Sequence, residues 1–183
     1  MKWNTSRKWG CPREFFVNSK EDCRCPVCDS ALKYRDQRLR VHKTAGGKKE
    51  WYLIRRLRCT NAGCRRIHNE LPDCMCPYKH YDAGLIEDVV DGVISEEDRE
   101  TEDYPCEGTM KHWRWWARRN AANMEGQMKS AAHRFLDLAD AFLRSPDSLL
   151  EGLKERMSPG WLAAAIRFIY NAGGFLDPYP PAG

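Results

Sequence analysis

Two closely spaced pairs of cysteines constrain the fold of this chain more than any other feature. Two residues separate Cys25 from Cys28, and four separate Cys59 from Cys64. Turns of this size let two thiolates converge on one ion, and zinc takes four such donors in a tetrahedron at about 2.3 Å. The two pairs therefore predict one structural Zn2+ ion held by Cys25, Cys28, Cys59 and Cys64.

The residues around each pair favour tight turns. Pro26 lies inside the first pair and Asp29 follows it, while Gly63 precedes the last cysteine, where a turn often needs a positive φ. The first residues lack the apolar core and the small-residue cleavage site of a secretory signal, so we expect a cytoplasmic protein. A reducing cytosol keeps thiols free, which favours metal binding over disulfides for the nine cysteines.

The segment between the two pairs has the pattern of a β-hairpin. Leu32–Val41 and Trp51–Leu57 alternate or are rich in strand-forming residues, and Ala45–Lys48 between them is a turn signal. A third short strand is expected over Arg66–Leu71, because Pro72 stops it. The hairpin would bring the two cysteine pairs together at one end, which is the layout of a zinc ribbon.

Other donors remain open as alternatives near these pairs. They are Cys23 in place of Cys25, His68 in place of Cys64, and Cys74 with Cys76 as part of a second site. The remaining thiols and imidazoles are expected to be ordinary thiols and surface or packing residues: Cys11, Cys106, His42, His80, His112 and His133.

The sequence motifs argue against an enzyme. His68-Asn69-Glu70 fits the first half of a zinc deaminase signature, but no P-C-x-x-C follows it. H-E-x-x-H, G-x-S-x-G and P-loop motifs are absent from the sequence. Four thiolates would close the coordination shell of the ion, so the predicted zinc is structural and the predicted protein is not an enzyme.

Charge is segregated along the chain. Residues 1–70 hold 18 Lys and Arg against 7 Asp and Glu, residues 71–108 hold 2 against 12, and residues 109–183 hold 10 against 7. The net charge of +4 thus hides a basic first part with a net charge of +11. A basic module suits a polyanionic partner, although a solvated face would show the same composition.

The pattern changes to helical after the cysteine-rich part. Asp82–Ile94 carries apolar residues at spacings of three and four, with Asp82 as a candidate cap. A short acidic helix is expected from Ser95 and is ended by Tyr104-Pro105. Thr109 is the candidate N-cap of a basic, Trp-rich helix. This order of helices is typical of a helix-turn-helix, whose last helix enters the major groove of DNA.

The Trp-rich helix sorts its residues onto separate faces. Its apolar stripe is Met110, Trp113 and Ala117, and its basic stripe is Lys111, Arg114 and Arg118. We expect Trp113 and Trp116 to anchor the helix in the core. An amphipathic helix that merely packs on its neighbours, with its cations in solvent, fits the same pattern.

Further helices are expected in the last third of the chain. Apolar residues from Met124 to Phe142 continue at helical spacing up to Ser145-Pro146, as a core or a dimer seam. Ser158-Pro159 is expected to start a final helix with Ser158 as its cap, and Gly173-Gly174 stops it. The predicted division is an arm (1–22), a zinc ribbon (23–77), a helix-turn-helix-like region (78–122), C-terminal helices (123–174) and a Pro-rich tail (175–183).

Several motifs together resemble an uncharacterised bacterial zinc-ribbon family that is associated with insertion-sequence transposases. The matching stretches are Cys25–Cys28, Arg55–Cys59, Arg66–Asp73, Pro77–Lys79, Asp103–Glu107 and Pro159–Leu162. The resemblance covers roughly residues 23 to 170. It implies a zinc ribbon joined to a helix-turn-helix-like region that acts on mobile-element DNA without a catalytic domain of its own, with a transposase as a partner.

The sequence therefore predicts an α+β protein: an N-terminal zinc ribbon, as a β-hairpin or a three-stranded sheet, followed by an all-α helix-turn-helix-like region. Its predicted function is non-enzymatic binding of double-stranded DNA, as a transposition accessory or a transcriptional regulator. The candidate phosphate contacts are Arg55, Arg56, Arg58, Arg65 and Arg66, and the candidate groove contacts are Lys111, Arg114, Arg118 and Arg119. The alternatives are a protein–protein adaptor, which includes a homodimer, and a binder of RNA or single-stranded DNA.

Overall fold

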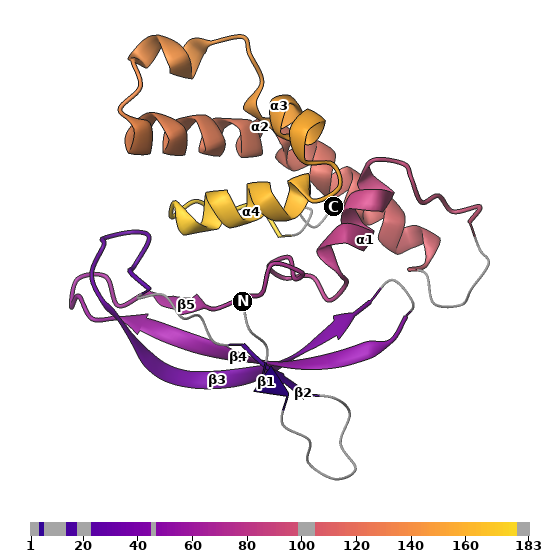
Figure 1. Cartoon of the computed structure of the whole chain (residues 1–183), viewed down its shortest axis with the longest axis horizontal. Coiled ribbons are helices and arrows are strands. Elements are labelled where there is room, and N and C mark those ends of the chain that lie inside the picture. Colours follow the sequence, from indigo (N-terminus) through magenta and orange to yellow (C-terminus); the bar gives the residue numbers. More distant parts are fainter. Residues whose placement is uncertain (1–3, 6–13, 18–22, 45–46, 99–104, 179–183) are drawn as a thin grey trace. The chain divides into compact units, whose positions relative to one another are not determined.

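The computed structural model describes residues 4–5, 14–17, 23–44, 47–98 and 105–178. The chain divides into two compact units, residues 1–82 and 83–183, and each is described by itself. The first unit contains the strands and the second the helices (Figure 1), which confirms the α+β class. Parts of the predicted arm and of the predicted tail lie outside the described residues.

A long antiparallel hairpin dominates the first unit. Strand β3 (Leu32–Lys43) pairs with β4 (Lys49–Cys59) over its whole length, from Leu32 opposite Cys59 to Lys43 opposite Lys49. Both strands run slightly further than the apolar alternation predicted. Gly47, at φ +68°, supplies the conformation that the predicted turn needs, while Ala45 and Gly46 lie outside the described residues.

Three short strands complete the sheet. The predicted third strand is present as β5 (Ile67–Asn69), which lies antiparallel to β4. Strand β2 (Glu14–Phe16) lies parallel to β4 further along, and β1 (Asn4–Thr5) pairs with β2. Strand β4 therefore has β3 along one edge and shares its other edge between β2 and β5.

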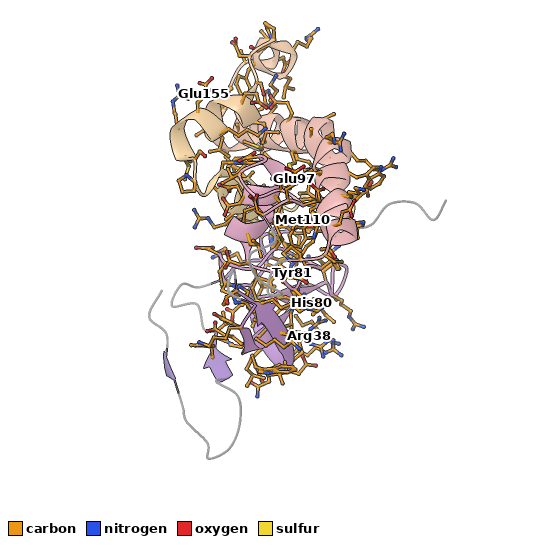
Figure 2. The ribbon with its side chains drawn as sticks, turned by 90° about the vertical axis from the view of Figure 1, so that its right-hand side faces the viewer. Arg38, His80, Tyr81, Glu97, Met110 and Glu155 are labelled. Carbon is orange, nitrogen blue, oxygen red and sulfur yellow. The ribbon has the colours of Figure 1, made fainter. Side chains whose placement is uncertain are left out.

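The core of the first unit is small and lies on one face of the hairpin. Tyr52 and Ile54 point to this face from β4 and pack with Val17 and Met75. The coil of residues 71–82 covers the same face, because the Lys43 N–H donates to the His80 carbonyl and an Arg40 Nη2 donates to the Lys79 carbonyl at 2.7 Å. Figure 2 labels His80 and Tyr81 on this coil and Arg38 on β3.

The second unit is built around one long helix. Helix α2 (Glu107–Leu136) packs against α1 (Ala83–Val90), α3 (Leu149–Met157), α4 (Trp161–Asn171) and the 3-10 helix η1 (Asp140–Arg144). The predicted apolar stripe of α2 is buried, as are Trp113 and Trp116. The stripe continues inside the same chain through Met124, Met128 and Ala131, whereas Phe135 is exposed.

The start of the second unit differs from the prediction in two ways. Helix α1 ends at Val90 rather than Ile94, because Gly92 turns the chain at φ +77°. The short helix expected from Ser95 is absent from the described part of this segment: Ser95–Asp98 form a turn in which the Ser95 N–H donates to Asp98. Residues 99–104, which include the predicted end of that helix, lie outside the described residues.

The ends of the later helices also differ from the prediction. Helix α2 begins at Glu107, with Cys106 at the N-cap position that was predicted for Thr109. It ends at Leu136 because Asp137 adopts the left-handed conformation, so only a 3-10 turn continues towards Ser145. Helix α3 was not predicted at all.

The final helix starts later than Ser158. The N-cap position belongs to Gly160, at φ +119°, and the helix begins at Trp161. The reason lies in another helix: the buried Glu87 carboxylate of α1 accepts from the Gly160 N–H at 2.6 Å and the Leu162 N–H at 2.8 Å. A distant carboxylate therefore does the capping that the sequence assigned to Ser158.

Candidate metal centre

The four predicted cysteines meet at the end of the hairpin that lies away from its turn. Cys59 is the last residue of β4, and Cys64 follows in a turn. Cys25 and Cys28 lie in a turn just before β3, and the isolated bridge between Arg24 and Ala31 closes the base of this turn.

Backbone hydrogen bonds shape the first cysteine turn. The Cys25 N–H donates to the Ser30 carbonyl at 2.9 Å, and the Asp29 N–H donates back to the Cys25 carbonyl at 2.8 Å. Asp29 takes a positive φ of 55°, a conformation that aspartate tolerates better than most residues. These bonds fix the direction of both thiols of the pair.

Asn61 organises the second cysteine turn. Its carbonyl accepts from the N–H groups of Cys64 and Arg65, and its side-chain Oδ1 accepts from the Gly63 N–H at 2.8 Å. The positive φ falls on Arg65, at 49°, and Gly63 has none. The sequence-based role of Gly63 was therefore wrong, because the asparagine side chain closes the turn without left-handed backbone at that position.

The sulfur atoms are spaced as the ligands of one tetrahedral ion would be. The Cys25 and Cys64 sulfurs lie 3.8 Å apart, and those of Cys28 and Cys59 lie 3.4 Å apart. All four lie within 4.8 Å of one another. Metal–sulfur bonds of about 2.3 Å at tetrahedral angles put ligand sulfurs about 3.8 Å apart. The residues present thus form a group that can hold a metal ion, as predicted.

The alternative ligands lie close to this group but outside it. His68 of β5 has its Nε2 at 3.4 Å from the Cys25 sulfur, and burial, followed by the nearby charge of Arg66, lowers the pKa of this imidazole. The Cys23 sulfur lies instead 3.6 Å from a carboxylate oxygen of Glu70. His68 can therefore donate a hydrogen bond to a coordinated thiolate, which is the role that neighbours of metal ligands often take.

The four thiols are not electrostatically equivalent. Hydrogen bonding to the side chain and backbone of Ser30 lowers the pKa of Cys28 to about 6. Burial raises the pKa of Cys59 to about 12. Cys28 therefore ionises more readily than Cys59, and a metal that binds here would have to displace the proton of Cys59.

The candidate phosphate contacts on the ribbon fall into two groups. Arg55 pairs with Glu70 at 3.4 Å, and Arg56 forms two bonds of 2.5 Å to the Asp36 carboxylate. Asp36 lies opposite Arg56 across the hairpin, and the hydrogen bonds from Arg56 lower the pKa of that carboxyl. These two arginines stabilise the sheet.

The three other candidate phosphate contacts of the ribbon point to solvent. Arg58, Arg65 and Arg66 are exposed and make no ion pair with any described residue. Lys33, also exposed, lies directly opposite Arg58 on β3. Like charges at facing positions destabilise a sheet, so this arrangement concentrates positive potential at the cysteine end of the hairpin at a cost in stability.

The candidate groove contacts on α2 are also divided. Arg114 donates to the Val89 carbonyl at 3.0 Å and to the Ile94 carbonyl at 3.1 Å, and it pairs with Glu96. This guanidinium holds the end of α1, so it is committed inside the unit. Lys111, although exposed, pairs with Glu107 one turn earlier.

The last two candidates on α2 lie on its solvent side. Arg118 and Arg119 are exposed, and the Arg119 guanidinium lies 5.4 Å from the centre of the Trp115 ring. The His112 ring stacks on the same Trp115 ring, with 6.4 Å between the two ring centres. Arg118 and Arg119 are therefore the groove candidates that the fold leaves available.

Sequence reasoning missed a second group of donors on the first unit. His42, Cys74 and Asp82 place one ligand atom each within 4.8 Å of one another. His42 was expected to be a surface or packing residue, Asp82 a helix cap, and Cys74 a partner of Cys76. No spacing signal connects these residues, because β3 and the coil that covers it bring them together only in the folded chain.

Comparison with protein families gives one match. Residues 25–113 match a family model described as a domain of unknown function (DUF6431). The matched segment includes all four clustered cysteines and ends inside α2. Comparisons with curated proteins and with solved structures gave no match. In the part of the chain that the structure describes, none of the helices has the length and apolar character needed to cross a membrane.

Proposed function

We propose that the first unit is a zinc-stabilised module that binds double-stranded DNA and performs no chemistry of its own. The observation that carries the zinc assignment is the convergence of four thiols at the separations of a tetrahedral site. A donor set of sulfur alone in this geometry is typical of structural Zn2+. All four positions would be filled by protein, which leaves none for a water or a substrate.

The exposed arginines beside the cysteine turns support the DNA assignment. Arg58, Arg65 and Arg66 lie next to the metal group with Lys33 facing Arg58, and no described acidic side chain neutralises them in an ion pair. A cluster of unpaired cations held by a rigid sheet suits a row of phosphates. Arg118 and Arg119 of α2 supply a second basic surface for the same ligand.

The resemblance to a zinc-ribbon family associated with transposases makes a role on mobile-element DNA the proposed biological setting. In that setting the protein would act as a transposition accessory or a transcriptional regulator in the cytoplasm, with a transposase as its partner. The absence of an open position at the four-thiol site agrees with an accessory role rather than a catalytic one.

A salt titration of duplex binding tests the proposal. If about five phosphates are neutralised, the logarithm of affinity should fall with the logarithm of salt concentration at a slope of about −4 to −5. Arg58→Ala with Arg66→Ala should reduce that slope by about 2. The matched control is Arg144→Ala with Arg156→Ala, two exposed arginines of the second unit. A slope near zero for the native protein, or an equal change in the control, contradicts the proposal.

A second candidate function rests on two pairs of arginine and aromatic side chains. The Arg55 guanidinium lies 5.8 Å from the centre of the exposed Tyr34 ring, and Arg119 lies over Trp115. Aromatic rings flanked by arginine stack on unpaired bases, so single-stranded DNA or RNA is the alternative ligand. Competition among duplex, single strand and RNA at equal nucleotide concentration decides between them, with Tyr34→Ala weakening only the single-stranded ligands.

A further inference from the structure

A second cluster of polar side chains lies on the first unit, at the turn end of the hairpin. His42 is the next-to-last residue of β3, whereas Cys74 and Asp82 come from the coil of residues 71–82. The four-thiol group lies at the opposite end of the same hairpin, about 30 Å away at about 3.3 Å per residue over the length of β4. The two groups share no residue.

The geometry around His42 is that of a ligand set. Its Nε2 lies 3.1 Å from Asp82 Oδ2, and the donor atoms of His42, Cys74 and Asp82 all lie within 4.8 Å of one another. Nitrogen and oxygen ligands of one tetrahedral ion lie about 3.3 Å apart, given metal–ligand bonds of about 2.0 Å. The observed separation fits two ligands of one ion as well as it fits a hydrogen bond.

Burial makes this arrangement unusual for a simple hydrogen-bonded pair. The His42 residue is only 3% exposed, and its Nδ1 is buried without a hydrogen-bond partner among the described residues. A buried ring nitrogen that lacks a partner is costly. The His42–Asp82 bond satisfies only one side of the imidazole, while the Cys74 thiol approaches the same point from the coil.

A carboxylate stands beside the second ring nitrogen. Glu50, directly opposite His42 on β4, has its Oε2 at 3.8 Å from Nδ1. Glu50 is itself held by the Tyr52 hydroxyl at 3.3 Å and by Lys48 Nζ at 3.4 Å. Metal-bound histidines commonly direct their other N–H to a carboxylate, which fixes the ring and strengthens the ligand.

We propose that His42 Nε2, Cys74 Sγ and Asp82 Oδ2 form a second binding site for a divalent transition metal of the zinc class, with Glu50 orienting the imidazole. A mixed set of nitrogen, sulfur and oxygen donors selects zinc-like ions over magnesium or calcium, which prefer oxygen alone. Three protein ligands leave one coordination position for water or another small ligand.

The site has a defined mechanical effect on the first unit. A metal ion at this site would join β3, through His42, to the coil, through Cys74 and Asp82. Cys74 also packs against the cluster of Tyr52, Ile54 and Met75, which this coil covers. Metal at this end would hold the coil onto the sheet, while the four thiols hold the other end. The hairpin would then be clamped at both ends.

Metal stoichiometry of the full chain tests this proposal. The metal-free protein is titrated with Co2+ as a spectroscopic probe and then with Zn2+, and bound metal is counted by elemental analysis after gel filtration. We expect two ions per chain for the native protein and one for Cys74→Ala. The absorption lost in Cys74→Ala should be that of a site with a single thiolate, which is much weaker than that of the four-thiolate site.

Two further variants keep the test decisive if Cys74→Ala alters the fold. Asp82→Asn keeps the side-chain volume and should also bind one ion, whereas Cys106→Ala removes an exposed thiol of the second unit and should bind two. Cys74→Ala and Asp82→Asn variants that both bind as many ions as the native protein overturn the proposal, whether or not the four-thiol group holds an ion.

Discussion

The two units of this chain differ in how many hydrophobic side chains they bury. Among the described residues, the first unit buries eight hydrophobic side chains, three of them cysteines, and the second buries twenty. A sheet with so few buried side chains gains little from the hydrophobic effect, so the metal ion proposed at the four thiols would supply stability that this core does not. The helical unit gains its stability from a continuous core around α2.

The comparison also shows how differently the units use charge. In the helical unit, buried or half-buried charged groups satisfy backbone atoms at helix ends: Glu87 at the start of α4, Glu125 at the start of α3, and Arg114 at the end of α1. In the sheet unit, several arginines face solvent beside the cysteine turns. Charged side chains thus hold helix ends in the helical unit, whereas the exposed arginines beside the cysteine turns of the sheet unit make no such contacts with the described residues.

Metal removal should separate the two units most sharply. Chelation or Cys59→Ser should unfold the sheet of the first unit, because metal binding to such thiol sites is worth on the order of 10 kcal/mol. The helices should keep their structure, since no helix of the described part contributes to the four-thiol group. Hydrogen exchange read by peptide measures both units in one sample, and simultaneous loss of protection in α2 and β4 would refute the contrast.

Loss of the Glu87 carboxylate should be the largest effect within the helical unit. Glu87→Ala leaves the N–H groups of Gly160 and Leu162 without their acceptor in a buried position, at an expected cost of about 3 kcal/mol. Urea unfolding followed by tryptophan fluorescence reports the change. Glu155→Ala, at an exposed position of α3 (Figure 2), is the control and should change the free energy of unfolding by less than about 0.5 kcal/mol.

Arg114→Ala should have the next largest effect, and it tests which arginines of α2 are structural. The substitution removes the bonds to the Val89 and Ile94 carbonyls and the pair with Glu96, for an expected loss of about 2 kcal/mol. Arg118→Ala, one turn further along, should leave the free energy of unfolding nearly unchanged. If the two variants unfold at the same urea concentration, Arg114 does not hold α1 in place.

The smallest expected effect concerns Glu125 and depends on pH. Burial alone would raise the pKa of this carboxyl, but hydrogen bonds from the Leu150 and Leu149 N–H groups, together with Lys129 and Ser148, lower it below the ordinary glutamate value. A depressed pKa in the folded state contributes stability above the unfolded pKa and loses it as the pH falls through the folded value. Glu125→Gln should therefore cost about 1 kcal/mol at neutral pH.

Unfolding measurements at a series of pH values check the expected effect of Glu125→Gln. The difference in free energy of unfolding between the native protein and Glu125→Gln should stay constant near neutral pH and shrink on acidification below the ordinary carboxyl range. Glu155→Gln, at an exposed position of α3, is the control variant measured in the same series. A difference that grows on acidification would show that the start of α3 does not bind the carboxylate form of Glu125.

The parts of the fold that the sequence predicted well depend on short-range patterns. Cys25–Cys28 and Cys59–Cys64 are local turns, and the strand alternation between them determines where the turns meet. The buried stripe of α2 was predictable for the same reason, since helical spacing decides which side chains share a face. Local periodicity was enough in each case.

The predictions that were wrong concern residues whose roles depend on contacts with distant parts of the chain. Gly160 replaces Ser158 as the cap because Glu87 approaches from α1, and Arg114 turns inward because it meets the end of α1. His42 and Asp82 come together only when the coil of residues 71–82 lies across β3. No spacing rule connects such residues, so the sequence assigned them ordinary roles.

The outer edge of β3 has a consequence for how the protein behaves in concentrated solution. Within the described residues, no further strand pairs with that edge, so a row of backbone donors and acceptors stays open over most of β3. Charged side chains at Lys33, Arg35 and Arg38, together with the bulge between Tyr34 and Asp36, oppose the approach of another strand. Lys33 therefore belongs both to the basic surface proposed for DNA and to the charges that keep the sheet from growing into an aggregate.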